Sequence, residues 1–194
     1  MAGVKQFNQE QVLDKAMEVF WQKGYEGTSI QDLTTATGLG RGSLYGTFGD
    51  KEQLFIKVLD HYADRFQAVI IKQLDNPDPD EAIKGMFEVM IERMSNPQYP
   101  RGCFNTNTCV SIFGKSEIIE RKIAERLGDL ESAIYLVLRK AQAENQLPPE
   151  RDIRALARFL VGVAQGMAVL NKTFADPSVI RDVAKVALSF WQQK

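Results

Sequence analysis

Helical periodicity runs through almost the whole chain and excludes most other architectures. Apolar residues recur three and four positions apart, and no segment keeps the strict alternation of a half-buried strand. Breakers such as "NPDP" at 76–79 and "NQLPP" at 145–149 separate the periodic segments. The pattern predicts an all-α chain of about nine helices, near residues 8–24, 28–38, 40–48, 50–75, 82–94, 103–113, 117–144, 152–174 and 178–192.

The composition excludes several classes of protein. With 194 residues, 44% of them hydrophobic, the chain is long enough to bury a core. No apolar run approaches the ~18 residues of a membrane span, and the first residues lack the apolar stretch of a signal peptide. Cys103 and Cys109 are too few for a secreted disulfide framework, and His61 is the only histidine. We therefore expect a cytoplasmic protein with no metal, no cofactor and no enzymatic activity.

The segment "TGLGRGSLYGTFGDK" at 37–51 is rich in glycine, as many phosphate-binding loops are. A dinucleotide fingerprint requires G-x-G-x-x-G directly after a strand, and a P-loop ends in G-K-[ST]. Here a helix precedes the glycines and the lysine follows an aspartate, which counts against a nucleotide site. Two short helices joined at Gly38 instead predict a helix-turn-helix, with Gly38 in the left-handed conformation of the turn.

The helix at 40–48 divides its side chains between a core and an exposed face. Leu44 and Phe48 are four residues apart and face the core, whereas Arg41, Ser43, Tyr45 and Thr47 face outward. Arginine reads base edges and hydroxyls reach phosphates, while Gly42 and Gly46 would let the helix lie close to a groove. Through residue 60 the chain has six basic and eight acidic side chains. DNA binding is therefore inferred from placement and not from net charge.

These residues carry a family resemblance. The segment "FWQKGYEGTSIQDLTTATGLGRGSLYGTFGDKEQLF" resembles the N-terminal domain of tetracycline-repressor-like (TetR/AcrR) transcriptional regulators. The resemblance implies a helix-turn-helix DNA-binding domain at 5–65, with its recognition helix at about 40–48. It also implies an effector-binding and dimerisation bundle at 66–194. Two residues depart from the usual family pattern: Gly40 stands where a serine usually caps the recognition helix, and Thr47 stands where a histidine is frequent.

The resemblance assigns a role to each matching position of the DNA-binding domain. It implies base contacts from Arg41 and Ser43, close approach at Gly42, and phosphate contacts from the following residues: Tyr45, Thr47, Lys51, Thr28 and Ser29. The residues themselves leave an alternative open, because Thr28 and Ser29 could serve only as helix caps and Tyr45 only as core.

The two last predicted helices suggest a dimer. "FLVGVAQGMAVL" at 159–170 is apolar on nearly all sides, with two small residues four apart. By itself the pattern also fits an intramolecular core, but the resemblance favours a four-helix interface between two subunits bound to a palindromic operator. The expected interface residues are Gly162, Gly166, Val183, Val186, Ala187, Phe190 and Trp191.

The resemblance further implies a small-molecule effector of unknown identity. Candidate residues are Phe66, Met86, Phe87, Met90, Cys103, Phe104, Asn107, Phe113, Tyr135, Phe159, Val163 and Met167, although methionine and aromatic residues at helical spacing also fit plain core. Asn105 to Thr108 form a polar run on a helix expected to be internal.

The function we expect is therefore that of a dimeric, sequence-specific DNA-binding regulator, a repressor released from its operator by the effector. The alternatives are an effector-independent architectural protein, or a regulator that senses oxidants or electrophiles through a cysteine.

Overall fold

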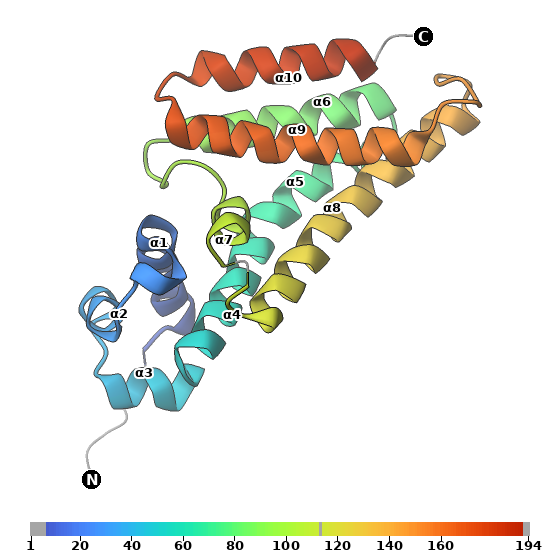
Figure 1. Cartoon of the computed structure of the whole chain (residues 1–194). Coiled ribbons are helices and arrows are strands. Elements are labelled where there is room, and N and C mark those ends of the chain that lie inside the picture. The colour runs from blue at the N-terminus through green and yellow to red at the C-terminus, as the bar shows by residue number, and fades with distance from the viewer. Residues whose placement is uncertain (1–6, 113, 192–194) are drawn as a thin grey trace. The chain divides into compact units, whose positions relative to one another are not determined.

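The computed structural model describes residues 7–112 and 114–191, and only the backbone of Phe190 and Trp191. Every regular element in these residues is helical (Figure 1). The elements are α1 (Gln9–Gly27), α2 (Ile30–Thr37), α3 (Arg41–Phe48), α4 (Lys51–Tyr62), the π-helical turn η1 (Ala63–Gln67), α5 (Ala68–Gln73), α6 (Pro79–Ser95), α7 (Phe104–Ile112), α8 (Glu117–Ala143), α9 (Ile153–Thr173) and α10 (Pro177–Trp191).

The elements α4, η1 and α5 follow one another directly and correspond to one helix of the sequence pattern. With these three counted as one, the predicted all-α class and the prediction of about nine helices are confirmed. Contacts divide the chain into two compact units, Met1–Asp64 and Arg65–Lys194. The assignment of DNA binding to 5–65 and of effector binding to 66–194 stays a prediction.

In the first unit, α1 packs against α2 and α4, and α3 packs against α4 and α2. Phe20 of α1 meets Phe55 of α4 edge to face, with ring centroids 4.8 Å apart, and Leu33 and Leu44 are fully buried beside them. The sequence predicts that the first helix stops at Gly24, and regular helical geometry does break there, although α1 continues to Gly27. Gly24 has a φ of 74° and a ψ of 170°, which kinks the chain before one more helical turn closes at Gly27.

Local capping sets the start and the end of α2. The Ser29 hydroxyl accepts a hydrogen bond from the Asp32 amide, and the Asp32 carboxylate accepts one from the Ser29 amide, forming the predicted capping box. Gly38 ends the helix with a φ of 72°, the left-handed conformation expected for this turn. Helix α3 then begins at Gly40 without a side-chain cap.

In the second unit, α9 packs against α8 and α10, α6 packs against α5, α8 and α10, and α7 packs against α8 and α9. Helix α9 is long and apolar enough to cross a membrane by length and composition, although two arginines interrupt it. This finding differs from the expectation that no segment approaches a membrane span. Core helices of water-soluble proteins share the same property, and α9 contributes Leu160, Ala164 and Met167 to the core of its own unit.

Candidate nucleic-acid interface

Helix α3 is anchored by one side and open on the other. Leu44 and Phe48 are buried in the first unit, as predicted. Arg41, Gly42, Ser43 and Gly46 are exposed, and Tyr45 and Thr47 are half-buried. The helix therefore exposes a face that carries only a few side chains.

The outermost ridge of this face consists of Gly42 and Gly46, which are four residues apart and point away from the core. A Cβ atom added at either residue would meet nothing within 4 Å. No contact within the described residues therefore requires glycine there, although each glycine costs a helix ~1 kcal/mol relative to alanine.

Three cationic side chains border α3, each placed near an aromatic ring. The Arg41 guanidinium carbon lies 5.6 Å from the centroid of Tyr45, and the Lys51 Nζ lies 4.5 Å from the centroid of Tyr25. The Lys57 Nζ lies 5.6 Å from the Phe48 centroid and donates to the Thr47 carbonyl at 3.5 Å. The sequence did not single out Lys57, because only the folded arrangement brings it to the end of α3.

Lys23 and Asp32 neutralise one another on the same unit. The Lys23 Nζ lies 2.5 Å from the Asp32 Oδ1, and hydrogen bonds from Lys23 and Ser29 hold the pKa of Asp32 well below its usual range. Lys23 is thus already paired with a carboxylate that stays ionised at neutral pH.

Two of the predicted phosphate contacts, the buried Thr28 and the exposed Ser29, form hydrogen bonds within the protein. Thr28 is only 1% exposed, and its hydroxyl donates to the Gly24 carbonyl at 2.7 Å. The Ser29 hydroxyl donates to the Asp32 Oδ2 at 2.8 Å and accepts from the Asp32 amide. These bonds correspond to the alternative in which both residues act locally, and the burial of Thr28 leaves its oxygen no surface on which to meet a phosphate.

Those predicted effector residues that the structure describes divide between the interior and the surface. Met86, Phe87, Met90, Phe104 and Met167 are buried and pack in the interior. Phe66 is buried but borders a surface pocket of about 200 Å³ with Arg65, Val69 and Tyr99 among its lining. These five interior residues fit the alternative of plain core. Other side chains of the core surround them, so a ligand would have to displace these neighbours to reach them.

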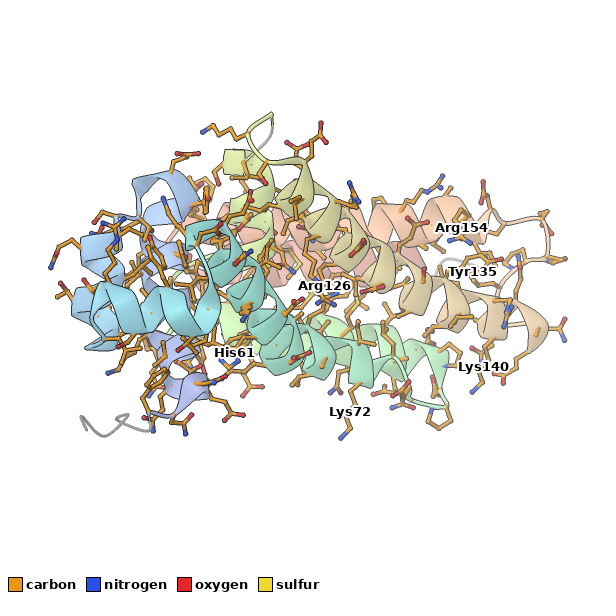
Figure 2. All side chains as sticks on the ribbon, turned by 90° about the horizontal axis from the view of Figure 1, so that it is seen from below. His61, Lys72, Arg126, Tyr135, Lys140 and Arg154 are labelled. Atoms are coloured by element: carbon orange, nitrogen blue, oxygen red, sulfur yellow. The ribbon has the colours of Figure 1, made fainter. Side chains whose placement is uncertain are left out.

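The remaining predicted effector residues are scattered. Phe159 is 44% exposed on α9 and so faces away from the interior. The Tyr135 ring lies under the Arg154 guanidinium, 3.9 Å from its carbon, between α8 and α9 (Figure 2). Cys103, Asn107 and Val163 are half-buried, and Phe113 lies outside the described residues.

The polar run of α7 is internal, as expected. Asn105 and Thr106 are both buried; the Asn105 amide donates to the Gln67 Oε1 at 3.2 Å, and the Thr106 hydroxyl donates to the Gln165 Oε1 at 2.6 Å. The Asn105 Oδ1 and the Asn107 Nδ2 are buried with no hydrogen-bond partner among the described residues. Buried polar atoms of this kind are few in native proteins, and they are positions where a ligand or water can bind.

The expected dimer residues divide into an exposed set and a buried one. Gly162, Gly166, Val183 and Val186 are at least partly exposed, and a Cβ atom at either glycine would meet nothing within 4 Å. Ala187 is an exception to the expectation, because it is 2% exposed and packs in the core of its own unit. The side chains of Phe190 and Trp191 lie outside the described residues.

Comparisons with known proteins match both parts of the chain. Residues 12–58 match the family model "Bacterial regulatory proteins, tetR family", and residues 79–187 match "Tetracyclin repressor-like, C-terminal domain". The chain is 35% identical over 191 residues to the HTH-type transcriptional repressor ComR of Escherichia coli K12, covering 97% of this chain and 91% of that protein. It is 33% identical to the uncharacterized HTH-type transcriptional regulator YezE of Bacillus subtilis, covering 97% and 98% of the two chains.

A solved structure extends the likeness to the fold. A cysteine mutant of the TetR family transcriptional regulator CifR, complexed with 26-bp double-strand operator DNA, aligns with a TM-score of 0.91 and 28% identity, covering 97% of this chain and 100% of that one. The family resemblance of residues 20–55 is thereby confirmed. The chain belongs to the TetR family of bacterial transcriptional regulators, which bind DNA and are not enzymes.

Proposed function

We propose that this protein is a cytoplasmic repressor that binds a palindromic operator as a homodimer through α3. The observation that carries the proposal is the exposed face of α3, where the ridge of Gly42 and Gly46 separates Arg41 and Tyr45 from Ser43 and Thr47. A bare ridge lets the helix axis approach the floor of the major groove, and the flanking side chains then reach both walls. The relative ComR is named a transcriptional repressor, which supports the sign of control.

The proposal gives each side chain of this face a distinct task. The exposed Arg41 guanidinium reads a base edge with two parallel donors, and Ser43 adds a short hydroxyl contact. Tyr45 and Thr47 donate to phosphates, as does Lys51 together with the amides that begin α4. The Thr47 hydroxyl donates to the Ser43 carbonyl at 2.9 Å in the free protein, so it must rotate to bind DNA.

Substitution of Arg41 tests this assignment. Arg41→Ala should weaken operator binding by about 1–3 kcal/mol per half-site and relax the sequence preference at one base pair, because a bidentate base contact is lost. Binding is measured on the palindromic duplex that the wild type enriches from a random library, at fixed salt. Arg139→Ala, at an exposed arginine of α8, is the control. Equal affinity of the wild type for the enriched and for random duplexes would favour the architectural alternative.

The proposed effector binds inside the second unit, next to the buried Asn105 and Asn107 atoms that lack partners. A ligand that donates a hydrogen bond would satisfy the Asn105 Oδ1, and one that accepts a hydrogen bond would satisfy the Asn107 Nδ2, which lies on another face of α7. Binding of the ligand in one conformation and of DNA in another then couples the two sites. A thermal-shift screen of small molecules, followed by operator release with each hit, tests this step; an absence of any hit that releases DNA counts against it.

Cys109 favours one alternative trigger. It is exposed, and it lines a pocket of about 490 Å³ between α7 and α8 with Ile112, Ile123 and Leu127 among its neighbours. A reactive small molecule could enter this pocket, which Glu117, Glu120 and Arg121 also line, and alkylate the thiol, whereas Cys103 is half-buried. Treatment with an oxidant or an alkylating agent should then lower operator affinity in the wild type and spare Cys109→Ser. Unchanged affinity of the treated wild type excludes this trigger.

A further inference from the structure

A tyrosine outside the predicted contact set lies against one of its members. Tyr25 follows the kink at Gly24, and its ring packs against Phe55 with centroids 5.0 Å apart and against Phe20 at 6.4 Å. These two rings belong to the buried core. The position of the Tyr25 ring is therefore fixed by the fold, independently of the Lys51 Nζ that lies 4.5 Å from its centroid.

The ring holds the Lys51 ammonium without cancelling its charge. A cation over an aromatic face is attracted by the ring quadrupole and remains a full positive charge. A carboxylate partner has the opposite consequence, as Lys23 shows in its pair with Asp32. Among the described residues Lys51 forms no ion pair, so its charge stays available to an incoming anion.

Carboxylates lie next to Lys51 in the sequence and compete for its ammonium. Lys51 is flanked in sequence by Asp50 and Glu52. Glu26 directly follows Tyr25 in the sequence, and burial, then the charges of Glu52, Glu26 and Asp50, raise the pKa of the Tyr25 phenol. An unrestrained ammonium could pair with one of them. The phenol itself stays neutral around pH 7 and adds no competing charge.

We propose that Tyr25 is a positioning residue for operator binding: its ring keeps the Lys51 ammonium away from the neighbouring carboxylates and ready for a DNA phosphate. The inference rests on the phosphate contact proposed above for Lys51. Cation–π pairs at exposed sites lead us to expect about a two- to fivefold loss of affinity per half-site without the ring. For a dimer on two half-sites the loss is about four- to twenty-fivefold.

A double-mutant cycle separates positioning from folding. Operator affinity is measured over a range of salt for the wild type, Tyr25→Leu, Lys51→Gln and the double variant, on the palindromic duplex that the wild type enriches from a random library. Lys51→Gln should lower the affinity and reduce the salt slope by about 2 for a dimer, since two phosphate contacts are lost. Tyr25→Leu should cost affinity in the wild-type background and nothing further beside Lys51→Gln.

The outcomes distinguish the inference from the function on which it rests. If Lys51→Gln leaves affinity and salt slope unchanged, the phosphate contact of Lys51 is wrong and the role of Tyr25 falls with it. If Lys51→Gln weakens binding but the losses of the two variants add, Lys51 contacts DNA and Tyr25 does not act through it. Tyr25→Phe keeps the ring and should bind as the wild type does; a loss as large as that of Tyr25→Leu overturns the role of the ring.

A measurement on the unmodified protein guards against misfolding of Tyr25→Leu. The ring current of Tyr25 should shift the Lys51 ε-methylene protons upfield in the DNA-free wild type and in Tyr25→Phe. Resonances at random-coil positions in the wild type show that the ammonium is not held over the ring and contradict the proposal, whatever the folding state of Tyr25→Leu.

Discussion

A single carboxylate organises the start of α2. Asp32 accepts hydrogen bonds from the Ser29 amide at 2.9 Å, from the Ser29 hydroxyl at 2.8 Å and from the Lys23 ammonium at 2.5 Å. All three donors favour the ionised form, which is why the pKa of Asp32 lies well below its usual range. Through these three hydrogen bonds, one ionised carboxylate joins Ser29 and Lys23 to the start of the helix before the turn.

The pH dependence of stability should report this charge. Folding lowers the pKa of Asp32 below the ~3.9 of an unfolded chain, so the unfolded state takes up the proton first as the pH falls. The stabilisation is therefore present above about pH 4 and is lost below it. Asp32→Asn should lower the thermal unfolding midpoint at pH 7 and show a smaller further drop on acidification. Asp75→Asn, at an exposed carboxylate, is the control, and equal acid profiles for Asp32→Asn and the wild type contradict the prediction.

At the scale of residues, the sequence predicts hydrogen bonds between near neighbours in the chain well, and it predicts contacts between helices poorly. The Ser29–Asp32 capping box and the turn at Gly38 were readable, because their partners are within four residues. The burial of Thr28 and the contact of Lys57 with the end of α3 were not readable. Both depend on how α1, α3 and α4 pack, and no spacing along the chain encodes that packing.

At the scale of elements, α3 is a weak helix held in place by its neighbours. It has eight residues, two of them glycine on the open ridge, and no side-chain cap at Gly40. The buried Leu44 and Phe48 hold it against the rest of the unit. The intrinsic helix propensity of α3 is therefore low at the face that we propose to meet DNA.

Replacing Gly46 with alanine should raise the stability of the unit and lower its affinity for the operator. Gly46→Ala adds a Cβ atom in open space and should stabilise the unit by about 0.5–1 kcal/mol. In the operator complex the same methyl group would overpack the contact, at about 1–3 kcal/mol, so affinity should fall. Thermal unfolding and operator titration measure the two effects. Gly128→Ala, also in a helix with open space around it, should gain stability and keep its affinity. A Gly46→Ala variant that binds as tightly as the wild type rules out a close approach at this residue.

Helix boundaries were largely predictable, with exceptions at the end of α1, which continues past Gly24, and at the π-helical turn between α4 and α5. Breakers such as Pro77 and Pro149 end the predicted segments within a few residues of the observed helices. The π-helical turn at Ala63–Gln67 left no sign in the sequence. One extra residue per turn changes which side chains share a face, and the apolar pattern from Leu54 to Ile70 fits a plain helix almost as well.

At the scale of the whole molecule, α9 and α10 carry an apolar face that the subunit does not cover. Phe159, Gly162, Gly166 and Val169 lie along one side of α9, and Val183 and Val186 lie along one side of α10. Val186 is 67% exposed. Helical periodicity places Ala187 in the core and its neighbour Val186 on the surface. Only the structure could show which of these two residues faces inward.

Introducing a charge on this face should prevent the proposed dimer. Val186→Asp places a carboxylate where the dimer would exclude water, at a cost of several kcal/mol. We expect light scattering at micromolar concentration to report a dimer for the wild type and a monomer for the variant, with a matching loss of operator affinity. Val110→Asp is the matched control, since Val110 is 76% exposed on α7 and lies off this face. A monomeric wild type would falsify the dimer.

The proposed effector site is the part of the molecule that the sequence constrains least. Methionines and aromatic residues at helical spacing describe a core and a pocket equally well, and five of the candidates lie in the interior. Our proposed effector site rests on the polar run from Asn105 to Thr108 instead, because apolar surroundings force each buried polar atom to find a partner. Sequence could locate this run but could not show which atoms remain unsatisfied.

The open glycine ridge of α3 also affects how such a regulator evolves. Most substitutions in a protein core are removed by selection because they destabilise the fold. At Gly42 and Gly46 many single substitutions would strengthen the helix instead. Under the proposed mode of binding, these variants would fold better and read a different operator or none. Selection must therefore act at these two glycines against substitutions that raise stability. Duplicated copies of the gene could diverge in operator preference at this ridge with no initial loss of folding.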